Sequence, residues 1–212
     1  MTTGTSEDGV VIWFVRHGQT DWNTQHRLQG HTDVPLNATG VAQAHAAAKR
    51  LQQVQPSFHH VVSSDLSRAL ITAQAIDASL DVGISLEPGL REHSLGHLQG
   101  LTFAEMTPRQ RRDYERLRTN PAFDGHGGES SLEMATRVRT TLATLAEQYA
   151  GKRIVAVTHG GFLYHANRNI REMSIDRSTD ATTPNACICV VEWRCGKWHI
   201  LEWGLTDHLT SC

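Results

Sequence analysis

Apolar residues along the chain occur in two patterns, short continuous runs and longer stretches with helical spacing. The short runs are rich in β-branched residues, which is typical of strands buried on both faces, and they occupy residues 10–15, 59–63 and 153–158. The helical stretches carry apolar residues three or four positions apart and alternate with these runs. Strands that alternate with amphipathic helices form βαβ units, so the pattern predicts a mostly parallel sheet covered on both faces.

Three long helices are predicted from the periodic stretches. The first has Asn37 or Thr39 as its N-cap, and the second has Ser64 or Asp65. The third follows a glycine-rich loop at residues 125–128. Their apolar faces are formed by Val41, Ala44, Ala48 and Leu51 in the first, by Leu66, Ala69, Leu70, Ala73, Ile76 and Leu80 in the second, and by Leu132, Ala135, Val138, Leu142, Leu145 and Tyr149 in the third.

The remaining segments complete the expected architecture. Residues 186–193 and 198–203 are typical of two strands around the turn at 194–197, which predicts an antiparallel edge. Residues 101–131 are polar, rich in arginine and weakly periodic, which predicts a helical excursion over the ligand-binding edge of the sheet. The expected fold is an α/β three-layer sandwich with a central mostly parallel sheet, an antiparallel edge strand and a helical lid.

Length and composition narrow the class of protein. The 212 residues suffice for one sizeable core, and we expect a flexible tail at residues 1–9 followed by a single catalytic domain over residues 10–212. Twenty Lys and Arg against 22 Asp and Glu give a net charge of −2 with no basic tract, so neither nucleic acid nor a membrane is an expected partner. The polar N-terminus lacks a secretory signal, and the four cysteines lack zinc-site spacing and are interpreted as reduced thiols. A cytoplasmic location is therefore expected.

Four side chains that suit phosphate chemistry follow the predicted strands. Arg16 and His17 end the first strand, His159 ends a later strand, and Arg68 lies in the first turn of a helix between them. In open α/β sheets, ligands bind beyond the carboxyl ends of the strands, so crossover units would bring these residues to one edge. Arginine offers paired N–H donors to phosphate oxygens, and a neutral imidazole is a nucleophile toward phosphorus. The pattern therefore predicts a site for a compact dianion.

Five ordered motifs extend this prediction. They are R-H-G-Q-T-D-W-N at residues 16–23, R-L-Q-G-H-T-D-V-P-L-N at 27–37, S-S-D-L-S-R-A at 63–69, L-R-E at 90–92 and T-H-G-G at 158–161. With these motifs the sequence resembles the histidine phosphatase superfamily, the phosphoglycerate-mutase-like proteins, over roughly residues 11–170. The resemblance implies a metal-independent phosphomonoesterase that hydrolyses a small-molecule phosphate through a phosphohistidine and needs no cofactor.

The resemblance also implies a role for each matching residue. His17 would be the nucleophile, and Glu92 would protonate the leaving oxygen and then activate water. The phosphoryl group and the substrate would be bound by Arg16, Asn23, Gln29, Gly30, Arg68 and His159. Cationic donors aimed at the phosphoryl oxygens stabilise the charge of the transition state, which agrees with these roles. No residue set in the sequence suggests a metal site.

Two segments depart from the family pattern and leave alternatives open. L-G-H-L-Q-G at residues 95–100 is closer to the mutases, whereas G-G-E-S at residues 127–130 is closer to the phosphatases, and the paired-arginine insert of glycolytic mutases is missing. The balance favours a phosphatase. The alternatives are a phosphoglycerate-type mutase that uses the same site, a binding protein of this fold without turnover, and a metal-dependent hydrolase. The natural substrate and the oligomeric state stay open, with a homodimer as one option.

Other chemically interesting residues have simpler interpretations. The arginines of residues 109–118 are expected on a solvated helix face, with the option that one of them contacts an anionic substrate. His93 and His97 are expected to be structural or exposed, because the surrounding sequence lacks a metal-binding pattern. The three tryptophans within residues 193–203 are expected to pack rather than to bind a ligand.

Overall fold

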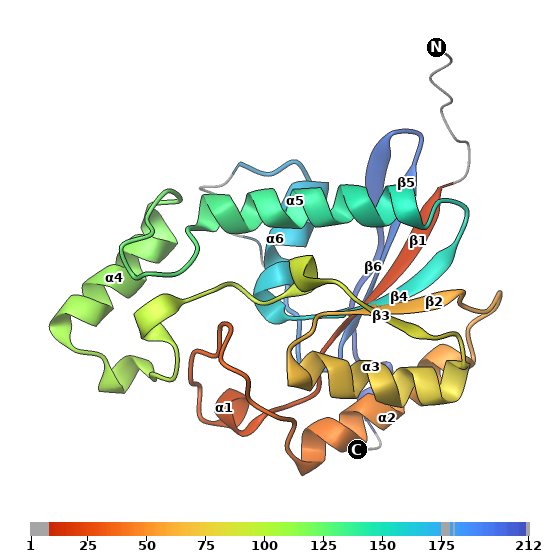
Figure 1. Ribbon diagram of the computed structural model, residues 1–212, viewed down its shortest axis with the longest axis horizontal. Coiled ribbons are helices and arrows are strands. Elements are labelled where there is room, and N and C mark those ends of the chain that lie inside the picture. The colour runs from red at the N-terminus through yellow and green to blue at the C-terminus, as the bar shows by residue number, and fades with distance from the viewer. Residues whose placement is uncertain (1–8, 175–178, 180, 211–212) are drawn as a thin grey trace.

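The computed structural model describes residues 9–174, 179 and 181–210, so most of the predicted tail and Cys212 lie outside the described residues. Its strands are β1 (Val10–Arg16), β2 (His60–Ser63), β3 (Ile84–Leu86), β4 (Arg153–Thr158), β5 (Ile188–Arg194) and β6 (Lys197–Leu205). They form one sheet in the order β3-β2-β4-β1-β5-β6 (Figure 1). The first four are parallel, whereas β5 runs antiparallel to both β1 and β6. The mostly parallel sheet and its antiparallel edge are thus confirmed.

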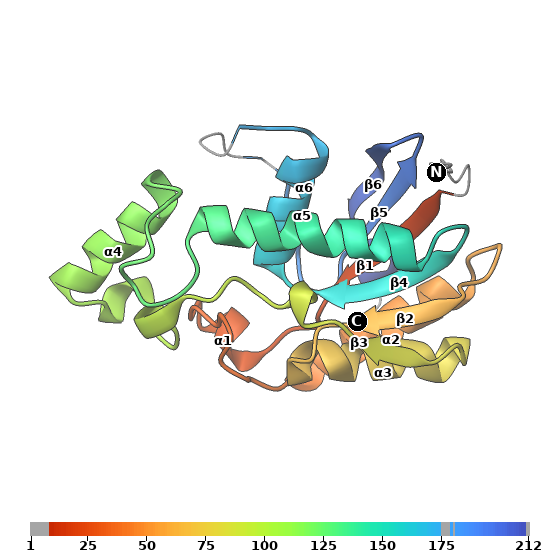
Figure 2. The ribbon, with the colours of Figure 1, turned by 45° about the horizontal axis from the view of Figure 1, so that its top comes forward.

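Helices cover both faces of this sheet. They are α1 (Asp21–Thr24), α2 (Ala38–Gln52), α3 (Ser67–Leu80), α4 (Pro108–Thr119), α5 (Ser131–Gln148) and α6 (Gly160–Ile170). Short 3-10 turns occupy Pro88–Leu90, Gly96–Leu98, Phe103–Glu105 and Asp207–Leu209. Helices α2 and α3 lie on one face and α5 and α6 on the other, which is the predicted three-layer arrangement (Figure 2).

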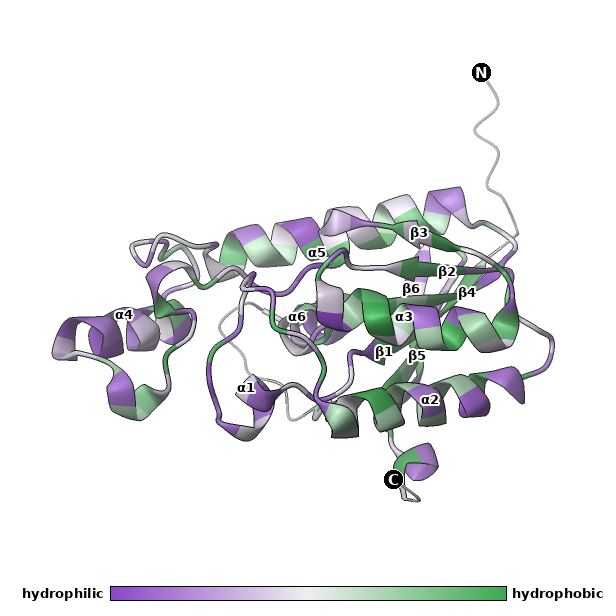
Figure 3. Ribbon diagram, turned by 60° about the horizontal axis from the view of Figure 1, so that its bottom comes forward, coloured by the Kyte–Doolittle hydropathy of each residue, from purple (hydrophilic) through white to green (hydrophobic). Residues whose placement is uncertain are grey.

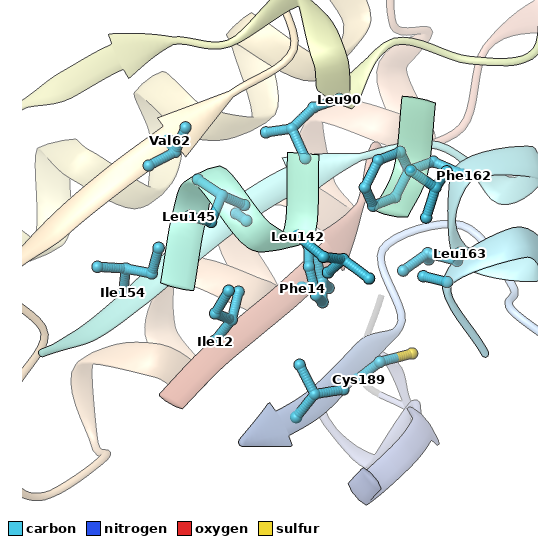
Figure 4. Close-up of a cluster of buried hydrophobic side chains, with 14 of the residues drawn as sticks. Ile12, Phe14, Val62, Leu90, Leu142, Leu145, Ile154, Phe162, Leu163 and Cys189 are labelled. Atoms are coloured by element: carbon cyan, nitrogen blue, oxygen red, sulfur yellow. The ribbon is translucent and has the colours of Figure 1, made fainter. Parts of the chain in front are cut away.

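The alternation of side chains along β1 creates a core on each face. Ile12 and Phe14 point toward α5 and α6, where Leu142 and Phe162 pack against them (Figure 4). Val15 points to the opposite core, which contains the alanine-rich faces of α2 and α3. All of these side chains are fully buried, so β1 is held from both sides and its carboxyl end is fixed in position.

Two predicted helix faces need correction at their first turns. Val41 is 40% exposed, because Gly40 takes the buried place and its Cα packs directly against the backbone of Gln19. Leu132 is 51% exposed, since the buried stripe of α5 begins at Met134, two residues and about 200° further round the helix. Side chains in a first turn lie at the edge of the sheet, where periodicity alone does not decide burial.

The predicted N-cap of α3 is also wrong, whereas that of α2 is confirmed. Asn37 accepts a hydrogen bond from the third residue of α2. In α3 the cap position is Leu66, which makes no side-chain cap, and the N–H of Ser67 donates to Oδ1 of Asp33 at 2.9 Å.

Strand β3 was not predicted, because three residues at a sheet edge carry too little pattern to distinguish them from a loop.

The polar segment within residues 101–131 forms α4, which projects from the body beyond one end of the sheet (Figure 1). Polar residues dominate this helix (Figure 3), and its buried positions are Asp113 and Leu117. At the opposite end, Trp193 and Trp198 pair across the β5–β6 hairpin with ring centroids 5.3 Å apart and pack against the core, as predicted.

Candidate active site

The two predicted site histidines follow neighbouring parallel strands. β1 ends at Arg16 and β4 ends at Thr158, and these two residues are partners in the sheet. His17 and His159 therefore leave the same edge side by side, with ring centroids 5.1 Å apart. They are 1% and 0% exposed, so both rings are shielded from solvent.

One nitrogen of the His17 ring is occupied and the other is available. Nδ1 lies 2.7 Å from the carbonyl oxygen of Gly18, which can only accept a hydrogen bond, so Nδ1 carries the proton. Burial, followed by the charges of Arg16 and Arg68, lowers the pKa of His17 well below its usual value. The ring is therefore neutral at pH 7, and Nε2 keeps the lone pair that a nucleophile needs.

Two arginines carry buried, unpaired N–H groups at this position. Arg68 donates to the carbonyl oxygens of Gly30 at 2.8 Å and Thr32 at 2.9 Å. Arg16 donates from Nη1 to the carbonyl oxygen of Thr183 at 2.6 Å. The Nε atoms of both arginines are buried without a hydrogen-bond partner in the described part of the chain. Burial lowers the pKa of both guanidinium groups, yet arginine keeps its proton in proteins, so two fixed cations have donors left for an anion.

His159 adds a third donor to this group. Its Nε2 lies 2.9 Å from the hydroxyl oxygen of Ser64. That oxygen already accepts from the N–H of Leu66 at 3.4 Å, which favours donation of the hydroxyl proton to Nε2. Nδ1 of His159 then carries the ring proton, and it is buried without a partner among the described residues. Burial, followed by the charge of Arg68, lowers the pKa of His159 well below its usual value, so this ring is neutral too.

A small network orients Asn23 and Gln29. Oδ1 of Asn23 accepts from the N–H of Thr20 at 3.0 Å and from Nδ2 of Asn185 at 3.2 Å. The amide orientation is thereby fixed, and Nδ2 of Asn23 is left as a donor. Oε1 of Gln29 accepts from the hydroxyl of Thr20 at 3.2 Å. Asn23 and Gln29 line the same cavity as Arg16, as expected for residues that contact a substrate.

Gly30 contributes its backbone to the site. Its φ of +52° lies in the left-handed region, and its carbonyl oxygen holds the guanidinium of Arg68. A Cβ at this position would lie 2.1 Å from Oε1 of Gln99. Gln99 in turn accepts from the N–H of His31 at 2.7 Å. Only glycine allows this packing, which keeps the loop and its arginine in place.

Glu92 lies against the beginning of α6. A Cβ added to Gly161 would lie 2.2 Å from Oε1 of Glu92, so the carboxylate occupies the space that a side chain would fill. Oε1 also accepts from the N–H of His93 at 2.9 Å. Glu92 lines the cavity together with Arg16, and its negative charge acts on both Arg16 and Arg68. A carboxyl group is thus available beside the two cations.

The loop that carries Glu92 is clamped by a residue that the sequence did not single out. Arg137 of α5 donates to the carbonyl oxygens of Gly89 at 2.8 Å, Arg91 at 2.9 Å and Glu92 at 3.0 Å. Its guanidinium is held by both carboxylate oxygens of Glu129 at 2.7 Å. Glu129 belongs to the G-G-E-S segment, so this motif supports the acid loop from behind.

These residues surround a cavity of about 590 Å³. Five of the predicted site residues line it, namely Arg16, Asn23, Gln29, Gly30 and Glu92. The other three, His17, Arg68 and His159, are almost fully buried beside them. The structure therefore brings all eight predicted residues to one place. The far wall is formed by α4 and α6, so the polar helix lies across the cavity from the predicted site residues.

Several residues on or behind the cavity wall were missed or misinterpreted. His93, predicted to be structural or exposed, lines the cavity, and so does His165. Arg118 is the arginine of residues 109–118 that reaches the cavity, whereas Arg111 and Arg116 lie over Phe103 and Phe123. Ser64, Arg137, Thr183 and Asn185 support the site by hydrogen bonds, and of these only Ser64 stood in a recognised motif.

Comparison with known proteins agrees with this geometry. The profile of the histidine phosphatase superfamily, branch 1, matches residues 12–206. The chain belongs to this superfamily. It is 36% identical over 203 residues to a metal-independent phosphoserine phosphatase of Arabidopsis thaliana, covering 94% of this chain and 83% of the relative. It is 37% identical over 207 residues to phosphoglycerate mutase-like protein 4 of the same plant, covering 95% and 88%.

Solved structures of the histidine phosphatase superfamily share the fold. A mutant phosphoserine phosphatase from Entamoeba histolytica in complex with phosphoserine gives a TM-score of 0.81 at 28% identity, over 94% of this chain and 99% of that one. A mycobacterial glucosyl-3-phosphoglycerate phosphatase gives a TM-score of 0.81 at 30% identity, over 93% and 100%.

The described residues contain neither a membrane-spanning helix nor a metal-binding group. Among residues 9–174, 179 and 181–210, no helix is long and apolar enough to cross a membrane. Within the same residues, no three His, Cys, Asp or Glu side chains are grouped in a way that could hold a metal ion.

The described cysteines form no disulfide. Cys187 and Cys189 are free and buried, and Cys195 is free and exposed.

Proposed function

We propose that the protein is a phosphomonoesterase that hydrolyses a small-molecule phosphate through a phosphohistidine at His17. The observation that carries this proposal is the set of buried, unpaired N–H groups of Arg16, Arg68 and His159 beside a neutral imidazole. An unpaired polar group costs free energy when it is buried, and a phosphoryl group supplies the acceptors that would satisfy all three. Family membership and relatives named as phosphatases support the same activity.

In the first step, Nε2 of His17 attacks phosphorus and the bond between phosphorus and the leaving oxygen breaks. Glu92, in its acid form, gives its proton to that oxygen, so an alcohol leaves and a carboxylate and a phosphohistidine remain. Arg16, Arg68 and His159 donate to the three phosphoryl oxygens, whose charge they stabilise in the transition state. Their positions are fixed before substrate binds, because backbone carbonyls and Ser64 already hold them.

In the second step, the carboxylate of Glu92 takes a proton from a water molecule while the water oxygen attacks phosphorus. The P–N bond breaks, inorganic phosphate leaves, and Nε2 of His17 regains its lone pair. Glu92 is again in its acid form, so the cycle closes without a metal or cofactor. The N–H of His93 donates to Glu92 at 2.9 Å and supports the carboxylate that exists between the two steps.

Trapping of the intermediate tests the proposal. Wild-type enzyme quenched during turnover should carry phosphate that is labile in acid and stable in base, as expected for a P–N bond. His17→Ala should carry none and should release no phosphate. His45→Ala is the matched control, because His45 is exposed on α2 and lies outside the site, and it should behave like the wild type. Label recovered on a hydroxyl, or full activity of His17→Ala, would contradict the proposal.

A phosphoglycerate-type mutase is the second candidate, because relatives carry that name. It would use the same phosphohistidine but return the phosphoryl group to a second hydroxyl of the organic product. Interconversion of 3- and 2-phosphoglycerate, measured beside phosphate release, separates the two activities. We expect release to water to dominate without any need for bisphosphoglycerate. Stimulation of interconversion by bisphosphoglycerate above the rate of phosphate release would favour the mutase.

The location and the assembly are further parts of the proposal. We infer a cytoplasmic protein, which the free Cys187 and Cys189 support because buried thiols persist in reducing compartments. We also infer a homodimer, since β6 offers an edge that pairs only with β5 in the described chain. Sedimentation velocity at micromolar concentration tests the second inference, and a monomer there would contradict it.

A further inference from the structure

The cavity continues well past the phosphoryl-binding donors. Its volume of about 590 Å³ lies within the range of pockets that enclose a whole small molecule. One face of α6 lines its length, with Gly161 beside Glu92 and then Tyr164, His165 and Arg168 further along. Arg168 lies seven positions after Gly161, which corresponds to a rise of about 10 Å along the helix axis. The wall beyond the leaving oxygen is therefore long enough to contact the whole organic part of an ester.

Arg168 is the exceptional residue of this wall. It is 7% exposed, and its guanidinium donates to the hydroxyl of Tyr164 at 3.2 Å and to the carbonyl oxygen of Ser174. No carboxylate lies within ion-pair distance of it in the described part of the chain. Removing a cation from water is costly when no opposite charge compensates it. Arg168 therefore resembles Arg16 and Arg68, whose guanidinium groups are also held by neutral oxygens.

No carboxylate among the described residues compensates the charge of Arg168, whose Cζ lies 5.4 Å from the centroid of the Tyr164 ring. Among the described residues that line the cavity, the acidic side chain is that of Glu92, beside the phosphoryl donors. Burial, followed by the charges of His93 and Arg168, lowers the pKa of His165 to about 3, so this neighbour stays neutral. Arg118 reaches the same cavity from α4 and adds a second positive charge. The far end of the cavity is thus a second place where an anion would be stabilised.

We propose that the organic part of the substrate carries a second anionic group, and that Arg168, assisted by Arg118, binds it. This inference rests on the phosphatase activity proposed above. Nη1 of Arg168 donates to the Tyr164 hydroxyl one turn back along α6, on the side of Glu92, whereas Nη2 donates to Ser174 beyond the other end of the helix. A carboxylate or a second phosphate several bonds from the ester oxygen would meet the guanidinium there. Arginine is suited to both groups through paired N–H donors.

Matched pairs of esters test this subsite. In the first pair, 3-phosphoglycerate carries a carboxylate where glycerol 3-phosphate carries a neutral hydroxymethyl group. In the second pair, fructose 1,6-bisphosphate carries a second phosphate that fructose 6-phosphate lacks. We expect wild-type kcat/KM to favour the anionic member of at least one pair, which also identifies the kind of anion. Arg168→Gln should lower kcat/KM for that member about 10- to 100-fold, the effect of losing a charged hydrogen-bond donor. The neutral member should change less than about 3-fold.

Further variants make the test decisive. Arg171→Gln is the matched control, because Arg171 is exposed just after α6 and does not line the cavity, and it should leave both members unchanged. Arg168→Lys keeps the charge and should recover part of the preference. If Arg168→Gln fails to fold, Arg118→Gln should show the same selective loss at a smaller size of about 3- to 10-fold.

The possible failures can be told apart. Equal losses for the neutral and anionic members in Arg168→Gln would show that Arg168 only supports α6, and an absence of preference in the wild type would refute the subsite. In both cases, the proposed phosphatase function would still hold if the wild type hydrolyses 4-nitrophenyl phosphate and His17→Ala does not. If the wild type hydrolyses neither 4-nitrophenyl phosphate nor any of the four esters, the proposed function itself fails.

Discussion

Replacement of Gly161 by alanine tests the role of Glu92 without removing a charged group. The added Cβ would lie 2.2 Å from Oε1 of Glu92 and 3.3 Å from Cβ of His93. The first distance is far below a van der Waals contact, so the carboxyl group has to move by about 1 Å. Alanine is favoured over glycine in a helix by about 1 kcal/mol, so we expect α6 to fold as before. The variant therefore displaces the acid and leaves the helix intact.

The expected effect depends on the leaving group. A misplacement of about 1 Å can cost about 100-fold in rate, which lies within the contribution of about 10²–10⁴ that a general acid makes. For 3-phosphoglycerate, whose alkoxide needs a proton to leave, we expect Gly161→Ala to lower the rate of phosphohistidine formation about 100-fold. This equals about 2.7 kcal/mol of transition-state stabilisation. For 4-nitrophenyl phosphate, whose phenolate leaves without that proton, the same step should slow less than about 5-fold.

Rapid-quench measurement of phosphohistidine formation separates this step from the later attack of water, which Glu92 also assists. Gly160→Ala is the matched control, because its Cβ would lie 3.4 Å from Cζ of Arg16 and leave Glu92 in place, so any slowing should be equal for the two esters. Glu92→Gln should show the same leaving-group dependence as Gly161→Ala. Equal slowing of both esters, or no slowing of the alkyl ester, would refute the role of Glu92 as proton donor.

Three further outcomes are expected. Arg68→Ala removes a fixed donor and should lower kcat about 10²- to 10³-fold in a phosphate-release assay; a loss below about 10-fold would contradict its role. Arg137→Ala frees the loop at residues 89–92, so it should reproduce the leaving-group dependence of Gly161→Ala, and equal effects on both esters would argue against a positioning role. Burial holds the pKa of His165 at about 3, below its value in the unfolded chain, so the unfolded state binds a proton first as the pH falls below about 6.5. This histidine should therefore contribute a loss of about 1.3 kcal/mol in unfolding free energy between pH 7 and pH 5.5, and urea titrations of His165→Gln should show a correspondingly smaller loss.

Strands β1 and β4 were predictable because each combines a continuous apolar run with a distinct boundary. Residues 10–15 of β1 and 154–157 of β4 are all apolar, so these stretches cannot be confused with the polar face of a helix. β3 has three residues with Ser85 at its centre, and it is recognisable only once β2 provides its partner. Pairing is a tertiary property, and a short edge strand therefore escapes a local pattern.

The site residues were predictable where they stand in motifs, and their supporting residues were not. Ser64 and Asp65 were interpreted as helix caps, because serine and aspartate after a strand usually serve that purpose. Instead, Ser64 binds His159 and Asp65 binds Arg91. His165 was not singled out, since the helical pattern of α6 cannot distinguish a cavity from solvent or core. Such assignments depend on which distant segment faces the side chain.

The arginines of this protein illustrate why sequence alone does not identify a binding site. Arg27 and Arg91 pair with carboxylates, so their charge is already compensated and they serve to join loops. Arg16 and Arg68 are held by backbone carbonyl oxygens, which fix their position without cancelling their charge. A cation held by neutral groups retains its full attraction for an anionic ligand and needs no reorganisation when that ligand binds. Arg168 meets the same criterion, and this is why the matched ester pairs are expected to distinguish it from the exposed arginines around it.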